Sequence, residues 1–227
     1  MILTNRKFVR EPPSRVAKSI FIFCEGAKRE YQYFMYFKEM DSRINVEVNK
    51  LNQSDNNSPL GLFEIAKSNI IRTSNNPNPK YSFQDGDEVW IVFDVDKDKE
   101  ESRKPQIVKV VKESSSFTNW RVAQSNPCFE VWLYNHLFDD NPTFEDNEYC
   151  NSWKKKVNEA INGGFDSRRH PIYIQKATKN SEKNYKEDEN NSPLIGCTQV
   201  FQLSKSILPL IEEKLKKVLT EIENQSG

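Results

Sequence analysis

Cysteine is scarce in this sequence, and long apolar runs are absent. The 227 residues include four cysteines that lie far apart and form no CxxC pair, so their spacing argues against a zinc site. No run of about 18 consecutive apolar residues occurs, and we therefore expect no membrane-spanning helix. Residues Met1–Lys7 also lack the apolar core of a signal peptide. These absences together predict a cytoplasmic protein.

Net charge is absent as well. The chain carries 33 basic and 33 acidic residues, so it is not a uniformly basic nucleic-acid coat, although a local basic patch is compatible with this balance. Apolar residues make up 36% of the chain and aromatic residues 11%, which is enough for a buried core. The length fits one large domain or one domain with an added lobe.

Two continuous apolar runs predict strands that are buried on both faces. They are Ile20–Cys24 and Val89–Phe93, and charged residues follow each of them at once. Strand patterns alternate with helical patterns as far as Asp139, which predicts a parallel α/β sheet with right-handed crossovers. Near the end of this region, Asn126 is expected to cap a helix at Phe129–Phe138.

The character of the chain changes after Asp139. We predict one domain at residues 15–139 and a mostly helical extension at residues 140–227 that packs on it. Residues 175–192 are rich in Lys, Asn and Glu and nearly devoid of apolar side chains, which predicts a flexible segment. A long amphipathic helix is then expected at Cys197–Ile222.

Acidic residues follow both apolar runs. Glu25 ends the first run, and Asp94 and Asp96 end the second, facing the same side because they are two residues apart. The carboxyl ends of parallel strands share one edge of a sheet, and ligands bind there. Clustered carboxylates repel one another unless a cation compensates them, and hard oxygen ligands suit Mg²⁺ or Mn²⁺. The sequence therefore predicts a metal site at this edge, with Gly26 allowing a tight turn.

Each acid also has a simpler interpretation. An Asp-x-Asp after a strand is often a solvated turn, and Glu25 could favour the N-terminal dipole of the next helix. A calcium loop is excluded, because Lys99 and Pro105 stand at the positions of its glycine and its bidentate glutamate. Glu130 lies in the first turn of a predicted helix. It is either a fourth acid at the metal edge or a residue that compensates the helix dipole.

Three segments of the chain resemble the RloB-like proteins, which carry a TOPRIM-type domain. They read CEGAKREYQYF, DEVWIVFDVDK and SNPCFEVWLYNHL, and the resemblance runs from about Arg6 to Asp139. Arg29 stands where that family usually has threonine, whereas Glu30 is kept. The resemblance implies a TOPRIM-like, Rossmannoid parallel sheet flanked by helices, followed by the C-terminal helical extension.

The same resemblance implies roles for the acids. Glu25, Asp94 and Asp96 match the positions that bind Mg²⁺ (or Mn²⁺) in TOPRIM domains for phosphodiester chemistry. Glu130 falls in a segment that resembles the family's "NPCFE" motif, which implies a role in the catalytic site. The implied activity is that of a metal-dependent nuclease acting on DNA or RNA, tRNA included, as an effector of bacterial anti-phage defence.

The resemblance also implies partners. Relatives pair with an ATPase of the ABC/SMC type, and this sequence has no GxxxxGK[ST] phosphate loop of its own, so an energy-coupled role needs such a partner. Lys28, Arg29, Lys97 and Arg103 flank the acidic edge and are expected to contact nucleic acid. A homodimer is kept open as a further form of assembly.

Two other functions fit an acidic strand edge. The first is a non-catalytic TOPRIM-like binding or regulatory subunit of a restriction or defence complex, in which the acids are structural. The second is a phosphatase or a phosphotransfer receiver. Receivers usually have a lysine after a later strand, where this chain has Ala123-Gln124-Ser125, so we rank this function third.

Overall fold

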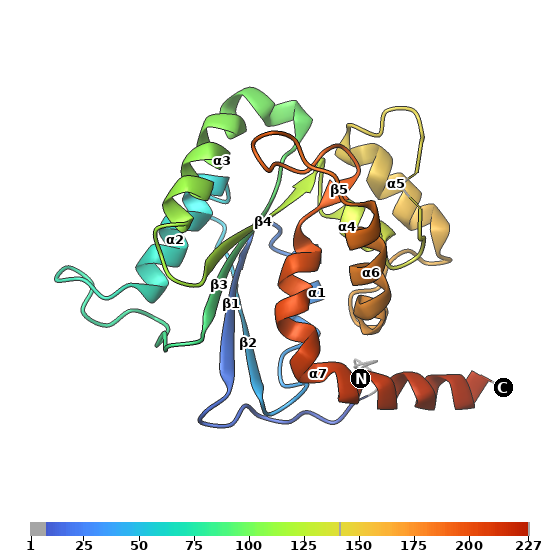
Figure 1. Cartoon of the computed structure of the whole chain (residues 1–227), viewed down its shortest axis with the longest axis horizontal. Coiled ribbons are helices and arrows are strands. Elements are labelled where there is room, and N and C mark those ends of the chain that lie inside the picture. The colour runs from blue at the N-terminus through green and yellow to red at the C-terminus, as the bar shows by residue number, and fades with distance from the viewer. Residues whose placement is uncertain (1–7, 141, 227) are drawn as a thin grey trace.

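The computed structural model describes residues 8–140 and 142–226, which leaves Met1–Lys7 outside the described part (Figure 1). The helices and strands are, in chain order, β1 (Lys18–Cys24), α1 (Arg29–Met35), β2 (Ile44–Asn49), α2 (Pro59–Ile70), β3 (Glu88–Asp94), the 3-10 helix η1 (Lys97–Lys99), α3 (Glu100–Ser114), β4 (Trp120–Asn126), α4 (Glu130–Tyr134), α5 (Cys150–Ala160), the 3-10 helix η2 (His170–Tyr173), α6 (Ile174–Asn184), β5 (Cys197–Thr198) and α7 (Val200–Ser226).

The strands form one sheet in the order β2-β1-β3-β4-β5. Strands β1 to β4 are parallel to their neighbours, whereas the two-residue β5 runs antiparallel to β4. The predicted α/β class, with a parallel sheet and a helical C-terminal region, is confirmed. The short β5 makes the sheet mixed at one edge.

The predicted burial of the apolar strands on both faces is also confirmed. Ile20 and Ile22 of β1 belong to a core that includes α1, α4 and α7, whereas Phe21 and Phe23 belong to a second core that includes α2 and α3. Successive side chains of a strand point to opposite faces, so a continuous apolar run fits a sheet that is covered on both sides. Figure 1 shows α2 and α3 on one side of the sheet and α1 and α7 on the other.

The helix expected at Phe129–Phe138 differs from the prediction. Asn126 does not cap it but ends β4, opposite Cys197 of β5, and its Nδ2 donates to the carbonyl of Pro193 at 2.8 Å. The helix is reduced to the five residues of α4. The strand partner of Asn126 lies some 70 residues further along the chain, so no local pattern indicated it.

The flexible segment expected at residues 175–192 is wrong over its first half, where α6 forms. Its inner face is made of small and polar side chains that have hydrogen-bond partners. The Thr178 and Ser204 hydroxyls lie 2.7 Å apart, and Asn180 Nδ2 donates to the carbonyls of Asn135 and Phe138. Polar groups can be buried when they are paired in this way, so a low apolar content did not mean disorder.

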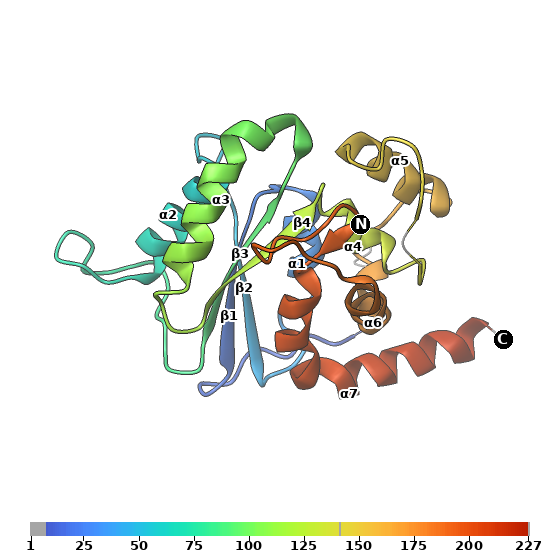
Figure 2. The same cartoon turned by 45° about the horizontal axis from the view of Figure 1, so that its top comes forward.

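The predicted C-terminal helix is confirmed as α7, which begins at Val200. Its first half packs against the sheet and α6, and its last turns extend away from the body of the molecule (Figure 2). None of the helices within residues 8–140 and 142–226 combines the length and the apolar character that crossing a membrane requires.

Replacing Asn180 by Ala tests whether α6 is held as described. The substitution leaves two carbonyls without their donor, and we expect the free energy of unfolding to fall by about 1–3 kcal/mol. Urea denaturation measures this change. Lys179→Ala, at an exposed position of the same helix, is the control and should change little. Equal effects of the two substitutions would contradict the arrangement.

Candidate functional site

The acids that follow β1 and β3 meet where the strand order of the sheet reverses. Glu25 directly follows β1, and its backbone N–H donates to the Val92 carbonyl of β3 at 3.1 Å. Its side-chain Oε2 lies 3.3 Å from the backbone nitrogen of Asp94, which donates to it. In open α/β sheets this switch point is the usual place for a ligand. The predicted proximity of Glu25 and Asp94 is therefore present.

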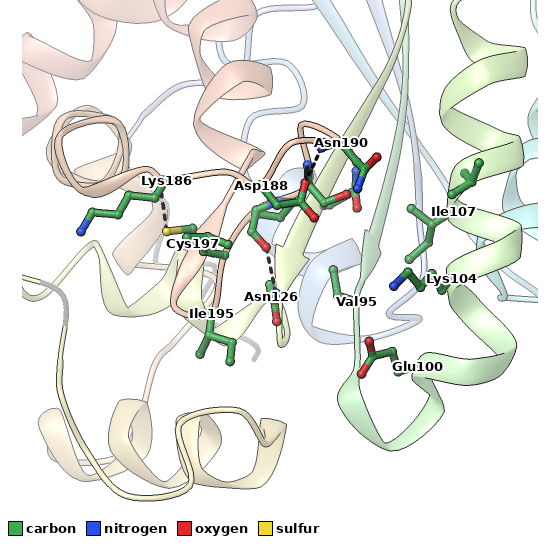
Figure 3. A pocket seen from close by; sticks show the side chains of 15 residues that line it. Val95, Glu100, Lys104, Ile107, Asn126, Lys186, Asp188, Asn190, Ile195 and Cys197 are labelled. Carbon is green, nitrogen blue, oxygen red and sulfur yellow. Dashed lines mark hydrogen bonds between the residues drawn. The ribbon is translucent and has the colours of Figure 1, made fainter.

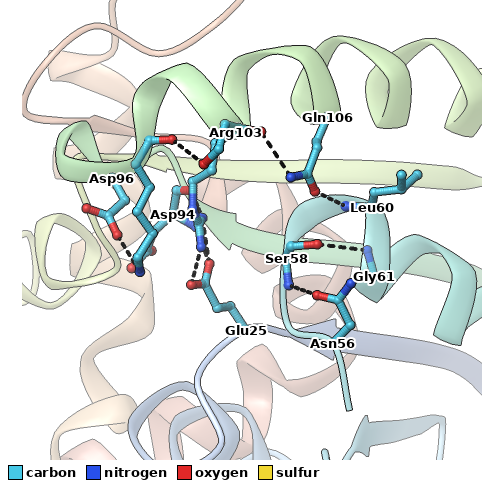
Figure 4. Close-up of polar contacts among 11 residues, drawn as sticks. Glu25, Asn56, Ser58, Leu60, Gly61, Asp94, Asp96, Arg103 and Gln106 are labelled. Carbon is cyan, nitrogen blue, oxygen red and sulfur yellow. Dashed lines mark hydrogen bonds and ion pairs between the residues drawn. The ribbon is translucent and has the colours of Figure 1, made fainter. Parts of the chain in front are cut away.

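Arg103, on α3, forms a bidentate ion pair with the carboxylate of Glu25 (Figure 4). Its two terminal nitrogens donate to the two carboxylate oxygens at 2.9 and 2.5 Å, and one of them also donates to the carbonyl of Asp94. The Arg103 side chain is 5% exposed and that of Glu25 12%. Arg103 was expected on the basic rim of the site, but it is buried beneath it and supplies a cation to the first acid.

Asp96 does not join Glu25 and Asp94. It has a positive φ of 53°, and its carboxylate forms an ion pair with Lys99 at 2.9 Å. The backbone N–H of Asp96 donates to the Pro127 carbonyl at 2.9 Å, which fixes the turn after β3. Figure 4 shows the Asp96 side chain to the left of the Arg103–Glu25 pair, with its own ion-pair partner.

The other basic residues expected at the rim are mostly engaged with acids. Arg29 donates to Glu130 at 2.7 Å, and Lys97 donates to Glu148 at 2.6 Å. Lys28 is exposed. Glu130 is 5% exposed, so this acid faces the interior of the site rather than solvent. The rim thus keeps exposed cations on the lysines, while Arg29 and Arg103 compensate two buried carboxylates.

Glu30 is a buried acid of the site that sequence reasoning passed over. It lies in the first turn of α1, is 6% exposed, and accepts a hydrogen bond from the backbone of Gly26. A Cβ atom at Gly26 would lie 2.6 Å from Glu30 Oε1, so any larger residue there would displace this carboxylate from its present position. The available signal was that Glu30 is kept in the segment resembling RloB-like proteins.

Burial and mutual repulsion hold two of these acids towards their neutral form. The pKa of Glu30 is raised to about 8, mainly by burial, with the Glu25 and Glu130 carboxylates adding to the shift. Burial likewise raises the pKa of Asp94 well above its usual value, helped by the charges of Glu30, Glu25 and Glu130. The charges of Glu25 and Glu130 therefore act on both Glu30 and Asp94 at this edge.

The donor atoms at this edge fit a hard cation, although not as the predicted trio. Among the described residues, no group of three or more His, Cys, Asp or Glu side chains is already arranged as a metal site. Oε2 of Glu30 and Oδ1 of Asp94 are buried, and the described part of the chain offers neither a hydrogen-bond partner. Carboxyl oxygens are the ligands that Mg²⁺ or Mn²⁺ prefers, and a bound cation would favour the ionised form of these two acids. Glu30 and Asp94, with Glu130 beside them, fit such an ion better than Asp96 does.

Comparison with known proteins gives one match. The family model described as RloB-like protein matches residues 20–207, which include every acid of the site. Neither a curated protein nor a solved structure matches the chain.

Stability should depend on pH through Glu30. Because its pKa is higher in the folded chain than its usual 4.5, the folded state binds the extra proton, and the free energy of unfolding should fall as pH rises from about 4.5 to about 8. One proton corresponds to a slope of up to about 1.4 kcal/mol per pH unit. Urea denaturation across this range should show a weaker slope for Glu30→Gln. Glu64→Gln, at an exposed acid, should keep the wild-type slope.

Removing Arg103 should destabilise the protein strongly. Arg103→Met leaves the Glu25 carboxylate buried without its cation, and we expect a loss of about 3–5 kcal/mol in the free energy of unfolding. Adding Glu25→Gln to the same chain should restore part of that loss, because the uncompensated charge is removed. Lys109→Met, at an exposed position of α3, serves as control. A loss below about 1 kcal/mol for Arg103→Met would contradict a buried pair.

Proposed function

The chain belongs to the RloB-like protein family, and from its site we propose that it is a divalent-metal-dependent nuclease that hydrolyses phosphodiester bonds of DNA or RNA. The observation that carries this proposal is the pair of buried carboxylate oxygens, on Glu30 and Asp94, for which the described residues provide no partner. A carboxylate cluster with only a structural role would lower the stability of the fold, because its members repel one another and lose their hydration. Strongly perturbed carboxylates in one place are typical of functional sites.

Glu30, Asp94 and Glu130 are the residues we propose to hold the ion. Bound there, Mg²⁺ or Mn²⁺ would polarise a phosphodiester oxygen and lower the pKa of a water molecule. The chain's own residues then have separate tasks. Arg103 keeps Glu25 in place beside Asp94, and we assign Glu25 the role of general base, which would accept a proton from an attacking water once an oxygen is released from Arg103.

The exposed lysines support binding of a polyanion. Lys28, Lys97 and Lys99 lie around the acidic edge, and the side chains of Lys97 and Lys99 are 44% and 58% exposed. A phosphate backbone can replace the weak surface ion pairs of these lysines, because exposed pairs contribute little to stability. We propose a role in anti-phage defence with an ABC/SMC-type ATPase partner in the cytoplasm, which rests on the resemblance alone.

A second function is favoured by a specific observation. Arg103 and Lys99 already compensate the charges of Glu25 and Asp96, so these two acids need no metal ion. This arrangement would suit a TOPRIM-like subunit that binds nucleic acid without cleaving it. In that case Mg²⁺ would bind weakly or organise the site only.

Cleavage of DNA and RNA in the presence of Mg²⁺ or Mn²⁺ tests the proposal. Asp94→Asn and Glu30→Gln each remove an anionic ligand, and we expect activity and Mn²⁺ affinity to fall by at least about a hundredfold. Mn²⁺ affinity, followed by electron paramagnetic resonance, is a readout that does not depend on cleavage. Glu64→Gln is the matched control on the surface.

The outcomes separate the two functions. Undiminished cleavage by Asp94→Asn would overturn the assignment of the site. Metal binding that depends on Asp94, without cleavage even when the partner ATPase is added, would favour the non-catalytic subunit. These arms use the full chain, because the site draws on elements from α1 to α4.

A further inference from the structure

Residues of α3 and of the chain around Asp188 line a cavity of about 710 Å³ (Figure 3). It lies between α3 and the segment that precedes β5, at the carboxyl ends of β3 and β4. Val95, the residue between Asp94 and Asp96, lines it, so the cavity begins beside the acidic edge. Its volume is in the range of pockets that bind small organic molecules.

Gln124, whose buried amide oxygen has no partner among the described residues, lines this cavity. Gln124 of β4 is 3% exposed, and no residue of the described part offers a hydrogen bond to its Oε1. The backbone of Gln124 is fixed, because its N–H donates to Gln199 Oε1 at 3.2 Å and its carbonyl accepts from the Gln199 N–H at 2.7 Å. An unpaired buried amide lowers stability, so its presence beside an open cavity points to a ligand that completes it.

Apolar side chains line the same cavity. Ile107 and Val108 come from α3, and Leu194 and Ile195 come from the segment before β5. Val108 is 61% exposed and Ile195 47%, so apolar surface is open to a ligand here. Apolar side chains and an amide in one cavity suit a flat heteroaromatic ring, with its faces on the apolar side chains and its polar edge on the amide.

Charged residues at the cavity's rim define the rest of the ligand. Lys104 extends from α3 into the cavity (Figure 3) and offers a cation to one phosphate group. The carboxylates of Glu100 and Asp188 also line the cavity, and a carboxylate in such a place accepts hydrogen bonds from sugar hydroxyls. Asp188 is itself held in place, since its Oδ1 accepts from the backbone N–H groups of Asn190 and Ser192 at 2.9 Å.

We propose that this cavity binds a nucleotide, with the base edge at Gln124, the base against the apolar side chains of the lining, and the phosphate at Lys104. This nucleotide has two possible sources. It is either one unit of a nucleic acid whose neighbouring phosphate reaches the carboxylates, which rests on the proposed function, or a free nucleotide from solution. Glutamine side chains read base edges through paired donor and acceptor contacts, which makes Gln124 the selective element.

Isothermal titration calorimetry with the full chain and the four nucleoside 5′-monophosphates tests the proposal. The measurement is made with EDTA present, so that neither metal binding nor cleavage contributes. We expect at least one nucleotide to bind, and Gln124→Leu to weaken it by about tenfold or more. Lys104→Gln should weaken it too. Gln84→Leu and Lys109→Gln, at exposed positions outside the cavity, should bind as the wild type does.

A thermal unfolding scan separates a binding role of Gln124 from a structural one. The described residues offer its Oε1 no partner, so Gln124→Leu should leave the melting temperature of the free protein unchanged or raise it. Failure of all four nucleotides to bind, or wild-type affinity in Gln124→Leu, would overturn the proposal.

Competition identifies the source of the nucleotide. If a base of the nucleic acid fills the cavity, the bound mononucleotide should compete with a single-stranded oligonucleotide, and an abasic position should weaken that oligonucleotide. If free nucleotide fills it, both should bind together. If the protein cleaves nucleic acid but binds no mononucleotide, the proposal of nucleotide binding in the cavity is refuted and the proposed nuclease activity is not. If it binds a nucleotide without cleaving nucleic acid, only the proposed nuclease activity is refuted.

Discussion

Repulsion among carboxylates at the switch point between β1 and β3 is the constraint on which the rest of the site depends. Glu25, Glu30, Asp94 and Glu130 come from separate parts of the chain, and the charges of Glu25 and Glu130 add to the rise that burial causes in the pKa of Glu30 and of Asp94. Arg103 compensates Glu25, and Arg29 compensates Glu130. One oxygen each of Glu30 and Asp94 is left without such a contact in the described residues. A fold retains an arrangement of this kind at a loss of stability, which is why we connect it with function.

Helix α3 links the carboxylate cluster to the cavity beside it. Arg103 reaches inward to Glu25 and to the carbonyl of Asp94, while the next residue, Lys104, lines the cavity. Gln106 joins the same helix to α2, since its amide oxygen accepts from the Leu60 N–H. A single rigid element therefore sets the position of the buried cation, the apolar wall and the rim cation relative to β3. Because both sites use this helix, the position of the cavity relative to the carboxylate cluster is fixed.

Sequence patterns predicted the sheet well where burial is continuous. The run Ile20–Cys24 could only be covered on both faces, and the acids after it and after β3 therefore had to share an edge. Patterns failed where polar groups are buried in pairs. Asn180 looked like part of a solvated segment, but its amide is used to satisfy two carbonyls of the chain after α4. Asn126 looked like a helix cap because its strand partner, Cys197, is remote in sequence.

The sequence by itself determined that buried strands end in carboxylates at one edge of a parallel sheet, because hydrophobic runs are local and strands that alternate with helices pair in parallel. It did not determine which cation faces which acid. Arg103 and Glu25 are 78 residues apart, and Asp96 is turned towards Lys99 by a backbone conformation that no motif encodes. Only the tertiary structure decided that Glu30 rather than Asp96 joins Asp94, because the pairing of buried charges depends on which helices pack at that edge.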